Sequence, residues 1–262
     1  PRRAGRSFPG LETDDAGDLV VGQEGFRMTG TLYGVGLGPG DPELLTLKAL
    51  RILKAAPVIA WPAPDEGDSF ARSIAADHLP GGQVEIAIRV PMRVERFPAQ
   101  EIYDRAAEEI AVHLNAGRDV AVLCEGDPFF YGSFMYLFSR LSGSYCVQVV
   151  PGVSSLTACA AELGTPLAAR NDVISAIPAT LDADTLTARL LATETALIVK
   201  AGRHLKKVKM VLDDLGVLDA AMYIERATME NQKIFSLSEV SEDSAPYFSM
   251  IMVRLRGESL DL

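Results

Sequence analysis

The chain has 262 residues, a net charge of −10 at pH 7 and a sequence pI of about 4.9. This acidic balance argues against a nucleic-acid binder, because such proteins neutralise phosphates with an excess of Lys and Arg. Hydrophobic residues make up 48%, as in ordinary globular proteins, and no apolar run approaches the roughly 18 residues of a membrane-spanning helix.

Cysteine and histidine are scarce and scattered. Cys124, Cys146 and Cys159 show no C-x-x-C spacing, so neither a disulfide framework nor a zinc site is predicted. None of the three histidines has a second His or Cys at metal-ligand spacing, so no bound metal is expected. A reducing cytoplasm is the expected compartment.

Residues 1–28 differ in character from the rest of the chain. They contain Arg2, Arg3 and Arg6, an acidic stretch over residues 12–18 and several glycines, without a sustained hydrophobic period. We expect Met28 to be the natural start and residues 1–28 to be an N-terminal extension outside the core. An arginine-rich targeting peptide is the alternative, but the aspartates of this segment argue against it.

The first half of the chain alternates strand patterns with helix patterns. Strands are predicted at residues 32–35, 57–61, 84–90, 120–123 and 146–150. Helices are predicted from Asp41 and over residues 101–115, the second ended by Gly117. Pro62 and Pro64 are expected to stop the second strand. Apolar strands that alternate with helices predict a parallel sheet covered on both faces.

The helix from Asp41 has a typical start. Asp41 takes the N-cap position, Pro42 the first helical position, and Glu43 supplies an acid in the first turn. Its apolar side is predicted to consist of Leu44, Leu45, Leu47, Leu50, Ile52 and Leu53.

Beyond Pro151-Gly152 the pattern changes. Strands are predicted at residues 173–177, 196–200, 221–226, 233–237 and 247–255, and helices at residues 154–163 and 204–215. The last two strands have no helix between them, which predicts a mixed sheet with an antiparallel edge. We therefore expect an α/β protein with domains at residues 29–150 and 151–262.

The segment Gly34-Val-Gly-Leu-Gly-Pro-Gly40 lies between the first strand and the first helix. Glycines at such a point allow the backbone to turn sharply and to approach a ligand. The dinucleotide pattern G-x-G-x-x-G fails in both registers, because Pro39 and Asp41 occupy its last position. No Gly-Lys-Ser/Thr follows, which excludes a Walker loop. Ligand contact is predicted, with a purely structural turn as the alternative.

A second motif, Cys124-Glu125-Gly126-Asp127-Pro128, follows the fourth strand directly. A carboxylate at the carboxyl end of a strand can accept hydrogen bonds from the hydroxyls or the ammonium group of a ligand. A plain Asp-Pro turn is the alternative.

Together these motifs resemble the tetrapyrrole methylase family, whose members methylate uroporphyrinogen and the precorrins. The resemblance extends over residues 29–255. It is carried by four motifs in the family's order: residues 34–49, Glu125-Gly-Asp-Pro128, Val150-Pro-Gly-Val-Ser-Ser155 and Glu225-Arg-Ala-Thr228.

Within that family, residues 125–137 resemble the branch that methylates carbon 20 of precorrin-2, giving precorrin-3A in cobalamin biosynthesis. Uroporphyrinogen methylases usually carry a glycine where Glu125 stands, and the basic loop at residues 89–96 also suits the carbon-20 branch. The metal-free substrate is favoured by residues 118–137. Cobalt-precorrin-2 as the substrate, or methylation at carbon 11 or 17, are the alternatives.

The resemblance implies two α/β domains, a parallel-sheet N-terminal one and a mixed-sheet C-terminal one, with the active site in the cleft between them. It also implies a homodimer and S-adenosyl-L-methionine as the cofactor. The implied cofactor contacts are Gly38, Pro39, Gly40, Glu125, Gly126, Asp127, Phe130, Ser154, Ser155, Ala201 and Ala227.

The tetrapyrrole substrate bears several carboxylates, so arginine side chains are expected around it. Arg89, Arg93 and Arg96 are the first candidates. A second basic cluster lies at residues 203–209, near a helix start where the dipole disfavours cations. A solvated helix face is the plainer interpretation of that cluster.

Methylation at carbon 20 requires the eventual loss of a proton from that carbon. Glu125, Tyr131 and Tyr33 are candidates for the base, because they lie on or beside the motif loops. Packing of the tyrosines and solvation of Glu125 are the plainer interpretations. Two other classes of function stay open: a nonenzymatic module that binds S-adenosylmethionine or a nucleotide, and a diphthine-synthase-like enzyme that acts on a protein side chain.

Overall fold

The structure is a computed structural model that describes residues 12–13, 19–20, 29–90, 97–241 and 243–256. The chain forms two compact units. The first runs up to Leu37 and resumes over Thr46–Gly152, and the second consists of Gly38–Leu45 and the chain from Val153 onward. Most of the N-terminal extension, including Met28, lies outside the described residues. Within it, β1 (Glu12–Thr13) and β2 (Leu19–Val20) pair in an antiparallel manner.

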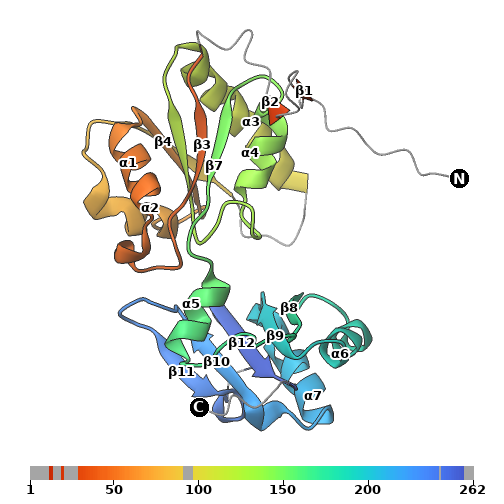
Figure 1. Cartoon of the computed structure of the whole chain (residues 1–262). Helices are drawn as coiled ribbons and strands as arrows, with labels where there is room; N and C mark the ends of the chain where they lie inside the picture. The colour runs from red at the N-terminus through yellow and green to blue at the C-terminus, as the bar shows by residue number, and fades with distance from the viewer. Residues whose placement is uncertain (1–11, 14–18, 21–28, 91–96, 242, 257–262) are drawn as a thin grey trace, which may run out of the picture. The chain divides into compact units, whose positions relative to one another are not determined.

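The first unit contains a five-stranded parallel sheet. Its strands are β3 (Leu32–Gly36), β4 (Val58–Ala63), β5 (Val84–Arg89), β6 (Val120–Cys124) and β7 (Val147–Val150), in the order β5-β4-β6-β3-β7. Helices α1 (Leu47–Ala55) and α2 (Phe70–Ala75) lie on one side of the sheet, and α3 (Phe97–Asn115) and α4 (Phe134–Leu141) on the other (Figure 1). The predicted parallel sheet with two covered faces is confirmed. Because all five strands are parallel, their carboxyl ends lie at one edge.

The second unit contains a mixed five-stranded sheet in the order β11-β10-β12-β9-β8. Its strands are β8 (Ile174–Pro178), β9 (Thr195–Val199), β10 (Ala221–Glu225), β11 (Lys233–Ser236) and β12 (Ser249–Arg254). Only β8 and β9 are parallel neighbours, so the predicted mixed sheet with an antiparallel edge is confirmed.

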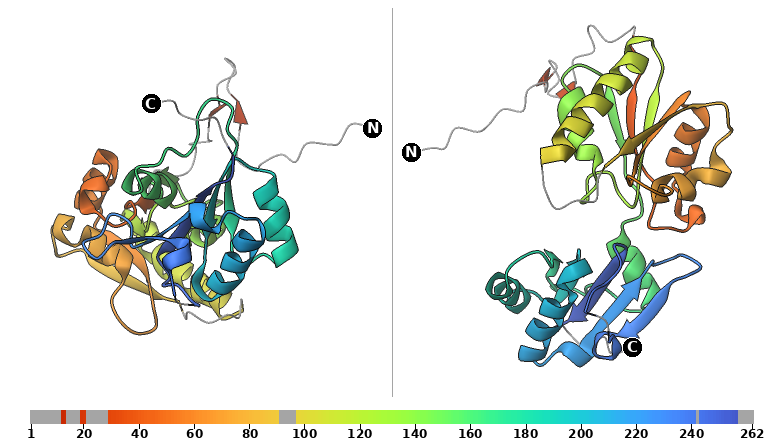
Figure 2. Two further views of the ribbon diagram at one scale, coloured as in Figure 1. Left: turned by 90° about the horizontal axis from the view of Figure 1, so that it is seen from below. Right: turned by 180° about the vertical axis from the view of Figure 1, so that it is seen from behind.

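Helices cover both faces of this second sheet. Residues of α5 (Ser155–Glu162) pack with Leu197, Met250 and Met252 on one face. Residues of α6 (Ala183–Leu191) and α7 (Leu205–Asp214) pack with Ile198 and Ile251 on the other face. Figure 2 shows α5 and the pair α6 and α7 on opposite faces of this sheet. The short 3-10 helices of the chain are η1 (Pro42–Leu44), η2 (Ala76–His78), η3 (Gly202–His204), η4 (Leu218–Ala220) and η5 (Leu237–Glu239).

The helix predicted to begin at Asp41 is two elements, which corrects that prediction. Asp41 caps only the 3-10 helix η1, and the next residue, Leu45, is extended. Thr46 then starts α1 by accepting a hydrogen bond from the backbone N–H of Ala49 at 3.1 Å. This start fixes which side of α1 is buried, so Leu47, predicted on the apolar side, is 86% exposed.

Pro62 was predicted to stop the second strand, and this is wrong, because β4 continues to Ala63. Residues of β4 up to Ala60 pair with both neighbours, whereas Trp61, Pro62 and Ala63 pair with β5 alone. Over this stretch β4 is an edge strand on its β6 side, where a residue without an N–H group is tolerated.

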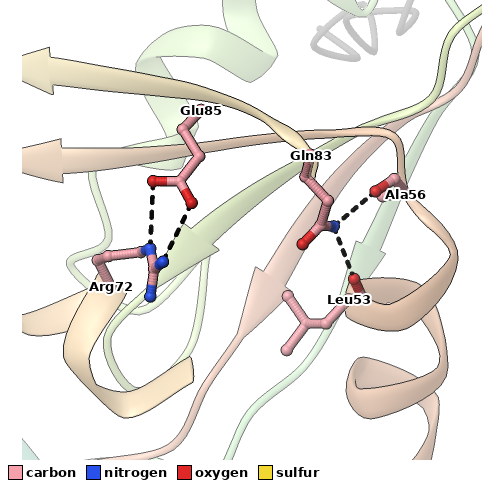
Figure 3. A network of polar contacts seen from close by, with 5 residues as sticks. All are labelled: Leu53, Ala56, Arg72, Gln83 and Glu85. Carbon is pink, nitrogen blue, oxygen red and sulfur yellow. Dashed lines mark hydrogen bonds and ion pairs between the residues drawn. The ribbon is translucent and has the colours of Figure 1, made fainter. Parts of the chain in front are cut away.

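Gln83 closes the carboxyl end of α1. Its Nε2 donates hydrogen bonds to the carbonyl oxygens of Leu53, at 2.9 Å, and Ala56, at 2.6 Å (Figure 3). In the same region Arg72 of α2 pairs with Glu85 of β5 at 3.0 Å. These contacts hold both helices of this face against the sheet.

We expect Gln83→Ala to lower the free energy of unfolding by about 1–2 kcal/mol, because two helix-end carbonyls lose their donor. Gln83→Glu is expected to be less stable than Gln83→Ala near neutral pH, since a carboxylate cannot donate to these carbonyls. Urea denaturation measures both variants. Arg72→Ala is the control and should cost about 1 kcal/mol or less, because its ion pair is partly exposed to solvent. Wild-type stability of Gln83→Ala would contradict this role.

Candidate functional site

Three glycines bring the loops after β6, β3 and β7 into direct backbone contact in the first unit. These strands are neighbours, so their loops emerge side by side. A Cβ atom on Gly152 would lie 2.0 Å from the carbonyl oxygen of Gly126 and 2.9 Å from the backbone of Gly36. A Cβ on Gly36 would lie 2.4 Å from the backbone nitrogen of Gly152. The two sequence motifs therefore meet at one point, which we call the glycine junction (Gly36, Gly126 and Gly152).

The carboxylate of Asp127 accepts two backbone hydrogen bonds at this junction. Its Oδ1 accepts a hydrogen bond from the backbone N–H of Phe129 at 2.9 Å. Its Oδ2 accepts one from the backbone N–H of Gly152 at 3.1 Å. The predicted cofactor carboxylate thus joins the loop after β6 to the loop after β7, while each oxygen retains a further lone pair for a ligand.

Glu125 follows β6 immediately and is half-buried. Burial raises the pKa of its carboxyl group, and hydrogen bonds from its own backbone N–H and from that of Ala71 in α2 oppose this shift only in part. The carboxylate of Glu125 therefore binds a proton more tightly than that of an ordinary glutamate.

Glu125→Gln is expected to raise the stability of the fold near neutral pH. Because the pKa of Glu125 is raised in the folded state, stability falls as the pH rises from the ordinary glutamate value through the raised pKa. The advantage of the glutamine variant should disappear below the ordinary glutamate pKa of about 4.3, because the Glu125 carboxyl group then becomes neutral in both the folded and the unfolded chain. Urea denaturation at pH 4 and pH 8 tests this, with the exposed Glu230→Gln as control. A variant less stable than wild type at pH 8 would refute it.

Tyr103 of α3 is a polar residue near Glu125 that the sequence interpretation missed. It is 4% exposed, and its ring centroid lies 5.0 Å from that of Tyr136. Burial raises the pKa of its hydroxyl, and a hydrogen bond with Ser133 opposes this shift in part, while electrostatic interactions with nearby groups, Glu125 among them, raise the pKa further. A tyrosine on the buried side of the helix at residues 101–115 was the available signal, because its polar tip needs a partner.

The other two base candidates lie in different places. Tyr33 lies in the amino-terminal half of β3, three residues before Gly36 and therefore about 10 Å along the strand from the glycine junction. Tyr131 lies on the loop after β6, 46% exposed, with a left-handed φ of 55° and its ring 4.9 Å from that of Phe130. Only Tyr131 and Glu125 are at the motif loops.

The second half of the glycine-rich loop packs within the second unit. A Cβ on Gly40 would lie 2.5 Å from Cγ of Met229 and 3.3 Å from the carbonyl oxygen of Ala227. The backbone N–H of Asp41 donates a hydrogen bond to Oγ1 of Thr228 at 3.1 Å. The first and last of the four motifs are therefore in contact here, although their order in the chain gave no sign of it.

Ala201 and Ala227 follow strands β9 and β10, which both pair with the antiparallel β12 between them. The two alanines therefore lie at one edge of the sheet, about 10 Å apart by strand spacing. Both residues are buried, Ala201 at 0% and Ala227 at 8% exposure. Ser154 caps α5, accepting a hydrogen bond from the backbone N–H of Leu156 at 3.2 Å, and Ser155 is the first residue of that helix.

The predicted arginines are only partly described. Arg89 ends β5, and its Nη1 donates to the carbonyl oxygens of Pro64, at 3.0 Å, and Asp65, at 3.3 Å. Arg93 and Arg96 lie outside the described residues.

The second basic cluster has mainly structural contacts. Nζ of Lys207 donates to the carbonyl oxygens of Ala179, at 2.7 Å, and Leu181, and Nζ of Lys209 donates to that of Val240. These contacts favour a structural role for the cluster. They differ from the solvated helix face of the sequence interpretation, because two of the lysines bind backbone carbonyls. Across the ranges that the structure describes, no helix combines the length and apolarity needed to cross a membrane.

Comparison with known proteins gives consistent matches. Residues 31–241 match the family of Tetrapyrrole (Corrin/Porphyrin) Methylases. The chain is 44% identical to Cobalamin biosynthesis protein CobIJ of Mycobacterium tuberculosis over 86% of its own length but only 46% of that protein. It is 42% identical to a Precorrin-2 C(20)-methyltransferase of Sinorhizobium sp, over 86% of this chain and 95% of that protein. The chain thus spans about half the length of the CobIJ relatives.

A solved relative has the same fold. The structure of Uroporphyrin-III C-methyl transferase from Thermus thermophilus, complexed with S-adenyl homocysteine, superposes with a TM-score of 0.61 at 26% identity. The match covers 86% of this chain and 92% of that one. The two sheets, the order of the motif loops and these matches define the class of the protein as an α/β tetrapyrrole methylase. The chain belongs to the tetrapyrrole methylase family. The family and cofactor predictions are confirmed.

Proposed function

We propose that this chain methylates carbon 20 of precorrin-2 with S-adenosylmethionine, giving precorrin-3A in cobalamin biosynthesis. The observation that carries the proposal is the similarity to the Sinorhizobium enzyme, which extends over nearly the whole length of both proteins. Residues 125–137 support it, since they resemble the carbon-20 branch and run from the glycine junction along the following loop into the first half of α4.

The predicted cofactor residues suit S-adenosylmethionine in kind. Glu125 and Asp127 supply oxygen acceptors for hydroxyl and ammonium groups. Ala201 and Ala227 have small side chains, which favours close approach of a ligand to the backbone at that sheet edge. We propose as cofactor contacts Gly38, Pro39, Gly40, Glu125, Gly126, Asp127, Phe130, Ser154, Ser155, Ala201 and Ala227. When bound, the cofactor supplies an electrophilic methyl group on sulfur.

The protein's own part in the reaction is orientation and proton removal. The reduced macrocycle is already a carbon nucleophile, so holding it against the methyl donor accounts for much of the acceleration. Carbon 20 loses a proton after methylation. We propose Glu125 as its acceptor, because its raised pKa suits a general base and it lies at the motif loops. Tyr131 is the second choice, and the position of Tyr33 along β3 makes it the least suited.

Substrate carboxylates are proposed to bind Arg89, Arg93 and Arg96. Arg89 is already oriented through one nitrogen by the carbonyls of Pro64 and Asp65. A guanidinium held in this way can present its other N–H groups to a carboxylate with little further loss of entropy.

A homodimer in the cytoplasm is also proposed. The edge strand β11 pairs with β10 alone and exposes Ile234 and Phe235, which supports self-association. The exposed thiol of Cys146 supports a reducing compartment. Light scattering of the purified protein tests the dimer, and a monomer at micromolar concentration would refute it.

The test of the proposed activity is incubation of the protein with S-adenosylmethionine and enzymatically made precorrin-2. Addition of one methyl group, placed at carbon 20 by NMR, is the expected result. Parallel incubation with cobalt-precorrin-2 distinguishes the two substrates. A methyl group at carbon 11 or 17 would refute the regiochemistry, and unchanged tetrapyrroles in both incubations would refute the function.

A further inference from the structure

The loop that carries Ala227 contains two consecutive turns. The backbone N–H of Met229 donates to the carbonyl oxygen of Arg226 at 3.1 Å, and that of Gln232 donates to the carbonyl oxygen of Met229 at 3.0 Å. Ala227 and Thr228 are the central residues of the first turn. Thr228 has a φ of 70° at the third position, where turns with a left-handed residue normally carry glycine.

This conformation is unfavourable for threonine. A β-branched side chain at positive φ is a marked outlier, and such residues persist only where the surroundings hold them. Arg226, on the other side of Ala227, also has a positive φ, of 49°. The backbone of Ala227 is therefore flanked by two residues in the left-handed region.

A chain of three hydrogen bonds holds the loop in place. Oγ1 of Thr228 accepts the backbone N–H of Asp41 at 3.1 Å. The backbone N–H of Thr228 donates to Oε1 of Gln232 at 2.6 Å. Nε2 of Gln232 donates to Oε2 of Glu162, at the end of α5, at 2.7 Å. The glycine-rich loop, the Ala227 loop and α5 are thereby joined within the second unit.

Glycine at position 228 would remove the strain but also the hydroxyl that binds Asp41. Threonine in this conformation lowers the stability of the fold but provides the hydrogen bond to Asp41. Strained residues of this kind are found at binding sites. Stability of the fold alone does not explain the choice of residue.

We infer that Thr228, Gln232 and Glu162 are positioning residues of the cofactor site. They fix the backbone of Ala227 and of the Gly38–Gly40 stretch in the orientation that binds S-adenosylmethionine. The inference rests on the proposed function, because it takes these two segments as cofactor contacts.

The test compares stability with cofactor affinity in the full-length chain. Thr228→Gly is expected to keep or raise the melting temperature while raising the Kd for S-adenosylhomocysteine about tenfold in calorimetry. The KM for S-adenosylmethionine should rise with little change in kcat. Thr228→Ser, which keeps the hydroxyl, should restore most of the affinity.

The other two positions have matched variants. Gln232→Ala should also raise the Kd about tenfold, whereas Glu162→Gln, which keeps an oxygen acceptor, should bind nearly as wild type. The exposed Glu230→Ala, in the same loop, is the control.

Wild-type affinity in both Thr228→Gly and Gln232→Ala would overturn the inference. A Thr228→Gly variant that loses stability and affinity together would overturn it as well, because that result indicates a structural role only. If the wild-type protein itself fails to bind S-adenosylhomocysteine, the proposed function fails, and with it the inference.

Discussion

Gly152→Ala is expected to lower the free energy of unfolding by about 3 kcal/mol or more. The added Cβ would lie 2.0 Å from the carbonyl oxygen of Gly126, a backbone atom that cannot move aside as a side-chain end can. The loops after β6 and β7 must therefore separate, which also breaks the hydrogen bond from Gly152 to Asp127. Urea denaturation measures the loss, and calorimetry with S-adenosylhomocysteine measures its effect on the proposed site.

Gly143→Ala is the matched control. It makes the same chemical change in the same unit, but a Cβ at Gly143 meets no atom within 4 Å. Its stability should change by less than about 1 kcal/mol in either direction. If the two variants have similar stabilities, the close packing of the glycine junction is not what constrains position 152.

Asp127→Ala is expected to lower the free energy of unfolding by about 2–3 kcal/mol and to weaken binding of S-adenosylhomocysteine. Two backbone N–H groups, of Phe129 and Gly152, lose a charged acceptor, and such bonds contribute about 1.5–3 kcal/mol each before solvent exposure is allowed for. Asp127→Asn keeps one side-chain oxygen acceptor and should be intermediate in stability. Thermal unfolding and calorimetry measure the two effects separately.

The exposed Asp68→Ala removes the same charge from the first unit without these partners and serves as control. Affinity for S-adenosylhomocysteine that is unaltered in Asp127→Ala would remove Asp127 from the proposed site. Unaltered stability would show instead that its two hydrogen bonds contribute little to joining the loops.

The sheets could be predicted because strands such as β6 are apolar throughout, β5 alternates apolar with polar residues, and clear breaks separate the strands. The three helices α2, α4 and α6 were missed. They have only 6, 8 and 9 residues, too few turns for a convincing hydrophobic period. For α6 a signal was present, since Asp182 caps the helix by accepting the backbone N–H of Thr185 at 2.8 Å.

The motif loops could be predicted from local sequence, but the contacts between them could not. Gly36, Gly126 and Gly152 are distant in the chain, and only the strand order β6-β3-β7 makes them neighbours. The same holds for Tyr103, whose relation to Glu125 depends on how α3 packs on the sheet. Gln232 and Glu162, 70 residues apart, carried no sequence signal at all.

The assignment of Gly38–Leu45 to the second unit has a consequence for how the protein is made. Asp41 leaves the ribosome 187 residues before its partner Thr228. At roughly 5–20 residues per second this interval lasts about 10–40 s. The parallel sheet can form during that time, but the segment between β3 and α1 must wait for the last third of the chain. A nascent chain arrested before Thr228 should therefore have a protease-sensitive glycine-rich loop beside an already protected sheet.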